Sequence, residues 1–318
     1  MSDYVTKNLE VLEEIKKAVI GKDESIQKVM MAILSKGHVL IEDIPGVGKT
    51  TLALAFSKVM NLKHNRVQFT PDVLPSDILG FSMYQKKTGN FTFQTGPIMC
   101  NLFLADEINR TSPKTQSALL EVMEEGQYTV DGVTRSVPVP FTVIATQNPL
   151  GSAGTQRLPE SQLDRFMICM SMGYPDIQSE ITIAKGRSIS SPIDSLVPLL
   201  DIKELAAMQA EAEQVFVHDV IFAYIADLVT ATRKHPMLDL GVSPRGTIAL
   251  TKMSKAKAYL ANRDYVTPGD VSSIFKDVVA HRIHLNSQAR MVKSSADDIL
   301  KDILNKIPKP APQNNTMR

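Results

Sequence analysis

The segment from Glu42 to Thr51 has glycine, lysine and threonine at the spacing of a phosphate-binding turn. It follows a short apolar run at residues 38–41, and a helical pattern comes directly after it. A turn between a buried strand and a helix directs backbone N–H groups and the positive end of the helix dipole at one spot. Lys49 can then reach phosphate oxygens, and the Thr50 hydroxyl can ligate Mg²⁺.

One position departs from the full pattern, which has glycine seven residues before Thr50, where this chain has Asp43. The later glycines, Gly46 and Gly48, are both present. Taken alone, the alternative interpretation is a glycine-rich turn that happens to precede a lysine.

Two adjacent carboxylates, Asp106 and Glu107, end a continuous apolar run at residues 101–105. Phosphoryl transfer needs a metal and an oriented water beside the phosphates. Asp106 suits holding Mg²⁺ through its water shell, and Glu107 suits polarising the attacking water. Without the phosphate-binding turn, a solvated strand end would explain the pair equally simply.

Three further polar residues occupy positions from which they could reach a phosphate. Asn148 directly follows another buried strand, where its amide could bind the γ-phosphate and the attacking water, or simply start a turn before proline. Arg165 precedes the last strand and fits either a surface ion pair or a cation offered to a neighbouring subunit. Arg245 begins a helix of the second domain, from which it could reach the same γ-phosphate.

Strands alternate with helices up to residue 172, and most of the strands are apolar throughout. That pattern predicts a largely parallel sheet covered by helices on both faces. Two short alternating runs predict hairpins at residues 82–95 and 127–139. A serine- and proline-containing stretch places the domain boundary at 186/187, and only helices are expected beyond it, up to residue 306. Residues 307–318 are expected to be a disordered tail.

The composition of the chain bears on its binding partners and on its location in the cell. Lys and Arg total 35 against 34 for Asp and Glu, so no excess of positive charge indicates nucleic acid or an anionic membrane. No apolar run approaches the roughly 18 residues that span a bilayer, and the N-terminus lacks the features of a secretion signal. Cys100 and Cys169 have no metal-type spacing, which favours buried thiols over a disulfide or a ligand. We therefore expect a cytoplasmic protein.

The order of these features resembles that of AAA+ ATPases, and among them the MoxR family. The resemblance covers nearly the whole chain and is carried by residues 70–80, 104–110, 113–121, 143–149 and 158–166. It implies an α/β P-loop NTPase of the AAA+ type, with a parallel sheet sandwiched by helices. The implied domains are a nucleotide-binding core at 1–186, which carries the two hairpins, and a smaller all-α lid at 187–306.

The resemblance also implies a role for each candidate residue. The implied ATP-binding residues are Pro45, Gly46, Val47, Gly48, Lys49, Thr50 and Thr51. Thr50 and Asp106 are the implied magnesium ligands, and Glu107 is the implied catalytic carboxylate. Asn148 corresponds to sensor 1, Arg165 to the arginine finger that acts on the adjacent subunit, and Arg245 to sensor 2. Arg157 is a second candidate for the trans-acting arginine.

The implied activity is Mg²⁺-dependent ATP hydrolysis by a ring, expected to be a homo-hexamer because one catalytic cation comes from the neighbour. The two hairpins correspond to inserts that face the central pore in related proteins. The family role is chaperone-like: remodelling a partner protein, often one with a von Willebrand factor A domain, and in some cases inserting a metal cofactor.

Two other classes of function stay open from the sequence. AAA+ cores also serve as nucleic-acid motors and clamp loaders, although the balanced charge and the lack of interleaved basic and aromatic residues in the hairpins disfavour that function. A nucleotide-gated scaffold with little turnover is the other alternative, and the intact Glu107 disfavours it.

Overall fold

The computed structural model describes residues 4–148, 158–186 and 192–310. The chain divides into two compact units, one formed by Ser2–Ala210 and the other by Glu211–Arg318 together with Met1. We call them the core unit and the C-terminal unit. Within the described residues, none of the helices combines the length and the apolar character that a bilayer crossing requires.

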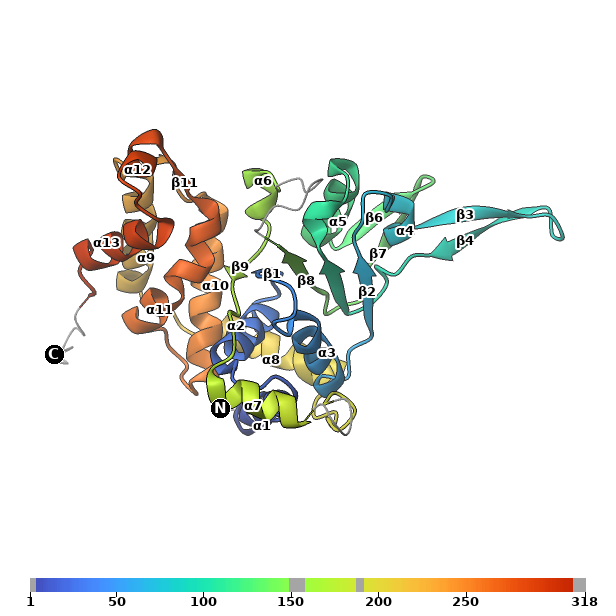
Figure 1. The fold of residues 1–318 in the computed structure, drawn as a ribbon, viewed down its shortest axis with the longest axis horizontal. Helices are drawn as coiled ribbons and strands as arrows, with labels where there is room; N and C mark the ends of the chain where they lie inside the picture. Colours follow the sequence, from blue (N-terminus) through green and yellow to red (C-terminus); the bar gives the residue numbers. More distant parts are fainter. Residues whose placement is uncertain (1–3, 149–157, 187–191, 311–318) are drawn as a thin grey trace. The chain divides into compact units, whose positions relative to one another are not determined.

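The core unit is built on a sheet of five strands that all run parallel, in the order β2-β5-β8-β1-β9 (Figure 1). The strands are β1 (Val39–Glu42), β2 (His64–Gln68), β5 (Leu102–Asp106), β8 (Thr142–Gln147) and β9 (Ile168–Met170). The connection from β1 runs to β2 at one edge of the sheet, and the connection from β8 runs in the opposite direction, to β9 at the other edge. Ligands bind in α/β sheets outside the carboxyl ends of the strands at such a reversal of direction.

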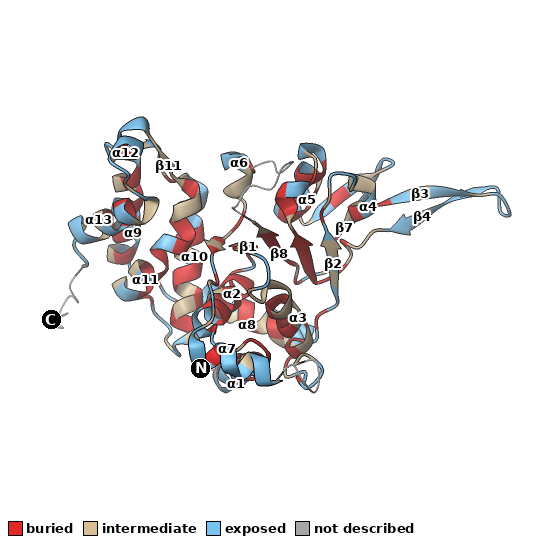
Figure 2. Cartoon of the chain, in the orientation of Figure 1, coloured by how far each residue is buried: buried red, intermediate tan, exposed pale blue. Residues whose placement is uncertain are grey.

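The inner strands are buried on both faces, as the apolar runs in the sequence predict. All five residues of β5 are buried, and so are three of the four in β1. Figure 2 shows these strands in the colour of buried residues. Edge strand β2 is different, because its side chains alternate between exposed and half-buried. The parallel sheet that the sequence predicts is therefore confirmed.

Helices surround this sheet. Those that belong to the core unit, in whole or in large part, are α1 (Tyr4–Ala18), α2 (Asp23–Leu34), α3 (Lys49–Val59), α4 (Pro75–Leu79), α5 (Pro113–Glu125), α6 (Glu160–Leu163), α7 (Ile177–Gly186) and α8 (Ile202–Gln214), with a 3₁₀ turn η1 (Ile108–Arg110). Helix α5 begins as its sequence predicts: Ser112 caps it by accepting from the Thr115 N–H at 3.3 Å, and Pro113 is its first residue. Gly126, with φ 64°, ends it.

Both predicted hairpins are present as two-stranded antiparallel pairs. Strands β3 (Gly80–Gln85) and β4 (Asn90–Thr95) form the longer one, which extends away from the sheet in Figure 1. Strands β6 (Gln127–Val130) and β7 (Val133–Ser136) form the shorter one. Its turn residues, Asp131 and Gly132, have φ of 54° and 74°, which is the conformation that a two-residue hairpin turn requires.

The division between the units lies at Ala210/Glu211, whereas the sequence predicts a boundary at 186/187. The difference arises because the segment after residue 191 packs on the core unit. The N–H groups of Leu199 and Leu200 donate to the Val59 carbonyl, at 2.8 and 3.3 Å, and the Gln209 amide donates to the Ile33 carbonyl at 2.7 Å. A composition change in a connecting segment carries no information about these contacts.

The C-terminal unit is mostly helical. Its elements are α9 (Asp219–Lys234), α10 (Pro244–Leu260), α11 (Pro268–Val279), α12 (Ser287–Met291), α13 (Ala296–Lys306), a 3₁₀ turn η2 (Ala280–Arg282), and a short antiparallel pair of β10 (Leu238–Leu240) and β11 (His284–Leu285). The sequence predicts the larger helices but not the β pair, whose strands are too short to show periodicity. Residues 311–318 of the expected tail lie outside the described residues.

Candidate functional site

The turn between β1 and α3 has the backbone conformation of an anion site. Gly46 and Gly48 have φ of 89° and 99°, a region that L side chains rarely adopt. A Cβ atom at Gly46 would meet no heavy atom within 4 Å, so the glycine is required by backbone conformation and not by space. Gly48 is the residue preceding α3, whose first-turn N–H groups have no partner within the helix. Residues 45–51 are exposed or half-buried, so an anion can approach these groups.

Lys49 lies at the start of α3 and folds over the turn. Its Nζ donates to the Asp43 carbonyl at 2.6 Å and to the Ile44 carbonyl at 3.1 Å. Burial lowers the pKa of Lys49, and the carboxylates of Asp43, Asp106 and Glu107 act in the opposite direction. The ammonium group therefore lies within electrostatic reach of all three carboxylates.

Asp43 explains how this turn forms without the first glycine of the general pattern. Its backbone φ is not positive, so glycine is not needed there. Its carboxylate joins the turn to the end of β9: Oδ2 accepts from the N–H groups of Met172 and Gly173, both at 2.7 Å, and from the Ser171 hydroxyl at 3.0 Å. Oδ1 accepts from the Ile44 N–H at 2.9 Å.

The environment of Asp43 keeps this carboxylate charged. Burial acts to raise its pKa, but the hydrogen bonds from Gly173, Ser171, Met172 and Ile44 outweigh burial and lower the pKa below its ordinary value. A second buried charge supports the same segment, because Lys22 Nζ donates to the Met172 and Gly173 carbonyls at 2.8 and 2.9 Å.

Asp106 is the last residue of β5 and is held by two donors. The Thr146 hydroxyl, on the adjacent strand β8, donates to Oδ1 at 2.6 Å. Arg66, on the edge strand β2, donates to Oδ2 at 2.7 Å and to the Gln68 side chain at 3.2 Å. Hydrogen bonds from both neighbouring strands therefore hold the Asp106 carboxylate in place.

Glu107 follows at once and has a left-handed backbone, with φ 57°. Such a conformation is uncommon for a residue other than glycine and tends to mark functional sites. Its N–H donates to the Thr146 hydroxyl at 2.9 Å, so one buried threonine fixes both Asp106 and Glu107. Its Oε2 pairs with Arg110 Nη1 at 2.7 Å. Sequence reasoning missed Thr146, Arg66 and Arg110 as parts of the site.

Asn148 lies one residue beyond β8, on the strand neighbouring β5, so the sheet brings it to the same edge as Asp106. The Asn109 amide donates to its main-chain carbonyl at 3.3 Å, which ties it to the η1 turn that follows Glu107.

The three candidate arginines are placed differently. Arg165 lies between α6 and β9, where its Nε is 3.1 Å from Glu124 Oε2 on α5. Arg245 is the second residue of α10 and belongs to the C-terminal unit. Arg157 lies outside the described residues. The core unit therefore brings together Lys49, Asp106, Glu107 and Asn148, whereas Arg165 of the same unit pairs with Glu124 on α5.

The residues at this edge fit a magnesium–nucleotide complex. Open space at Gly46, helix N–H groups and an ammonium group suit polyphosphate. The hydroxyl of Thr50, the second residue of α3, and the Asp106 carboxylate are the oxygen ligands that Mg²⁺ prefers, and this ion usually retains several waters.

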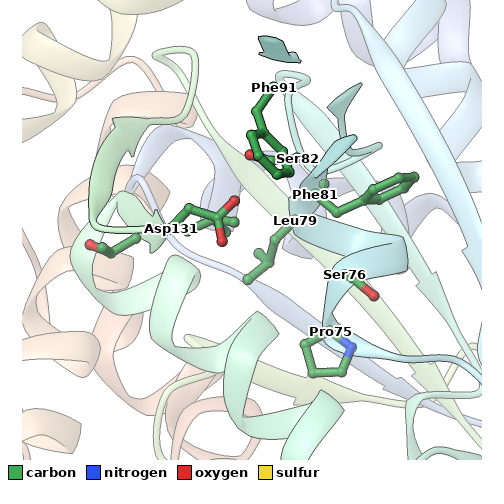
Figure 3. A pocket seen from close by; sticks show the side chains of 10 residues that line it. Pro75, Ser76, Leu79, Phe81, Ser82, Phe91 and Asp131 are labelled. Carbon is green, nitrogen blue, oxygen red and sulfur yellow. The ribbon is translucent and has the colours of Figure 1, made fainter. Parts of the chain in front are cut away.

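A second feature of the core unit is a cavity of about 720 Å³ between α4, the base of the β3–β4 hairpin and the β6–β7 turn. Figure 3 shows Leu79, Phe81 and Asp131 around it. The hairpin beside it exposes several large apolar side chains: Phe81 is 47% exposed and Phe91 is 72% exposed. Exposed apolar patches of this kind are typical of interaction surfaces.

Comparisons with known proteins agree with this geometry. Residues 38–168 match the family described as "ATPase family associated with various cellular activities (AAA)", and residues 230–303 match the AAA lid domain. The chain is therefore an AAA-type P-loop protein with a lid.

Its relatives define the family more closely. Chaperone MoxR1 from Mycobacterium tuberculosis is 36% identical over 93% of this chain and 81% of its own length. The Bacillus subtilis protein YeaC is 46% identical over 94% of this chain and 93% of its own. The chain belongs to the MoxR family of AAA ATPases. A crystal structure of a candidate ATPase from Cytophaga hutchinsonii matches with a TM-score of 0.90 and 36% identity, covering 97% of this chain and 96% of that one.

Proposed function

We propose that this protein hydrolyses ATP in a Mg²⁺-dependent reaction at the carboxyl edge of the core sheet. The single observation that carries the proposal is the convergence of Lys49, Asp106 and Glu107 beside a glycine turn with the φ values of an anion site. Membership of an ATPase family supports it.

The roles of the residues follow from their chemistry. Residues 45–51 bind the phosphates through backbone N–H groups and through Lys49. Thr50 and Asp106 hold Mg²⁺, which when bound neutralises the phosphate charge that develops during transfer. Glu107 accepts a hydrogen bond from the attacking water and orients it. Asn148 donates to the γ-phosphate region from the neighbouring strand.

We infer further that the working form is a ring, with a homo-hexamer as the expected state. Arg165 carries this step: it pairs with Glu124 on α5, and among the described residues no hydrogen bond or ion pair joins it to Lys49 or Glu107 of its own subunit. An arginine in that position suits a neighbour's nucleotide, where it would stabilise the charge of the transition state. Arg245 would couple the C-terminal unit to the γ-phosphate.

The proposed use of hydrolysis is remodelling of a partner protein. The exposed aromatic side chains of the β3–β4 hairpin and the apolar cavity at its base support a protein substrate. A relative named a chaperone supports the same class of function. A partner with a von Willebrand factor A domain, and insertion of a metal cofactor into that partner, are the more specific forms of this proposal.

The test is the ATPase rate per subunit across a dilution series, for the wild type and for Arg165→Ala. A shared site predicts that specific activity rises with concentration and that the variant is inactive but binds ATP. Glu124→Ala is the matched control, because it removes the same ion pair and leaves the arginine in place. If activity is flat with dilution and Arg165→Ala keeps the wild-type rate, both the ring and the trans-acting arginine are refuted.

A further inference from the structure

Glu107 has its main chain fixed more firmly than its side chain. The main chain is left-handed and donates to Thr146, so the Cα position is set by β8. The side chain is 27% exposed, and within the described part of the chain its carboxylate forms one ion pair, with Arg110. A glutamate in water has several rotamers of similar energy, so a fixed main chain alone does not set where the carboxylate points.

Arg110 comes from a turn that is itself anchored. The η1 turn closes with the Arg110 N–H donating to the Glu107 carbonyl at 2.9 Å. Its other two residues, Ile108 and Asn109, are buried. The Gln116 side chain on α5 donates to the Ile108 carbonyl at 3.2 Å, so a helix of the core holds the turn in place. The guanidinium group therefore reaches Glu107 from a rigid base.

The ion pair engages one oxygen of the Glu107 carboxylate. Arg110 Nη1 binds Oε2 at 2.7 Å, and among the described residues no ion pair engages Oε1, the oxygen that we expect to accept from the attacking water. In phosphoryl transfer the transition state is loose, and the task of the carboxylate is mainly to place the water in line. Orientation therefore matters more to the rate than added basicity, and a charge-assisted hydrogen bond from a planar guanidinium gives orientation.

We propose that Arg110 is a positioning residue that sets the direction of the Glu107 carboxylate for attack by water. The inference rests on the proposed ATPase function and adds a residue to it. Arg110 acts through Glu107 and contributes nothing to nucleotide affinity, because its ion pair is with the Glu107 carboxylate and the turn proposed to bind phosphate is a separate loop.

The test is a kinetic series of Arg110→Ala, Arg110→Gln and Arg110→Lys. We expect kcat of Arg110→Ala to fall about tenfold, the size of effect that loss of one charge-assisted hydrogen bond has on a rate. The dissociation constant of a fluorescent ATP analogue should change less than about twofold. Arg110→Lys should recover part of kcat, because lysine keeps the positive charge although it lacks the planar guanidinium group. Arg110→Gln has no charge and should not recover kcat. Lys114→Ala, which removes an exposed cation at the start of α5, should keep the wild-type rate.

A double-variant cycle separates positioning from a general structural effect. In a Glu107→Gln background, Arg110→Ala should leave the residual rate and the melting temperature unchanged, because the carboxylate it orients is gone. A further tenfold fall in that background, or a loss of ATP-analogue binding, would refute the proposal. If Glu107→Gln is inactive but Arg110→Ala keeps the wild-type kcat, only the role of Arg110 is refuted. If Glu107→Gln itself keeps the wild-type rate, the proposed function fails first.

Discussion

Replacing Asp43 by glycine, which would restore the residue of the general pattern, should destabilise this protein. The substitution removes the acceptor of four hydrogen bonds, three of which join the turn between β1 and α3 to the residues that follow β9. It also adds backbone freedom to the unfolded chain, since glycine has the largest conformational entropy to lose.

The size of the stability loss depends on which hydrogen-bond donors are left without an acceptor and cannot bind water instead. Met172 is buried, so its N–H is left without an acceptor, whereas Ser171 is exposed and Gly173 is half-buried, and both can regain water. One buried unpaired donor costs about 1–3 kcal/mol, and the change to glycine adds about 1 kcal/mol. We expect a loss of about 3 kcal/mol in the free energy of unfolding, equivalent to about 10 °C in melting temperature for a unit of this size.

The assay is thermal unfolding with urea titration beside it, for wild type, Asp43→Gly and Asp43→Asn. The asparagine variant keeps an oxygen toward Met172 and should lose only about 1 kcal/mol. Because the folded pKa of Asp43 is lowered from 3.8, the stability it adds is present above pH 3.8 and is lost as the pH falls through the folded value. The difference between wild type and Asp43→Gly should therefore shrink in acid. An unchanged or higher melting temperature for Asp43→Gly would refute this reasoning.

Three other predictions concern single buried groups. Thr146→Val removes the donor to Asp106 and the acceptor for the Glu107 N–H. The ATPase kcat should fall roughly 10- to 100-fold, and the free energy of unfolding measured with urea should fall by about 1–3 kcal/mol. An unchanged kcat would contradict the role given to this hydroxyl. Burial lowers the pKa of His38 to about 4 from 6.5, so between pH 7 and pH 5 the unfolded state gains a proton that the folded state does not. Over this pH range the free energy of unfolding of the wild type, measured with urea, should fall by about 2 kcal/mol more than that of His38→Gln. Equal losses for the two proteins would refute this prediction. Burial raises the pKa of the Cys100 thiol to about 11, so a thiol reagent at pH 8 should label Cys100 only after denaturation, as peptide mapping would show.

Much of the fold could be predicted from the sequence because its signals are local. The apolar run of β5 becomes a fully buried strand, and the Ser112 and Pro113 signal starts α5. The Asp131–Gly132 pair makes the turn of the shorter hairpin. In each case the residue type and its immediate neighbours determine the structure. The alternation of strands and helices then restricts the topology to a parallel sheet.

The parts that could not be predicted depend on contacts between distant residues. Thr146 lies in a buried strand, and its sequence context is typical of a core residue. Its hydroxyl lies between Asp106 and Glu107 only because β8 is adjacent to β5 in the sheet. Arg66 and Arg110 have no distinguishing pattern of their own. The end of the core unit depends on hydrogen bonds such as that of Gln209 with the Ile33 carbonyl, which join residues far apart in the chain. Such pairings follow from packing and leave no periodic signal in the sequence.

The central claim is that the carboxyl edge of this sheet hydrolyses ATP with Glu107 as the residue that orients the water. The most direct measurement is steady-state release of phosphate from Mg²⁺-ATP by wild type and Glu107→Gln, with binding of a fluorescent ATP analogue measured on the same samples. We predict turnover by the wild type, at least a roughly 100-fold lower kcat for Glu107→Gln, and unchanged analogue binding. Equal rates for the two proteins, or wild-type protein that binds the analogue without releasing phosphate, would contradict the claim.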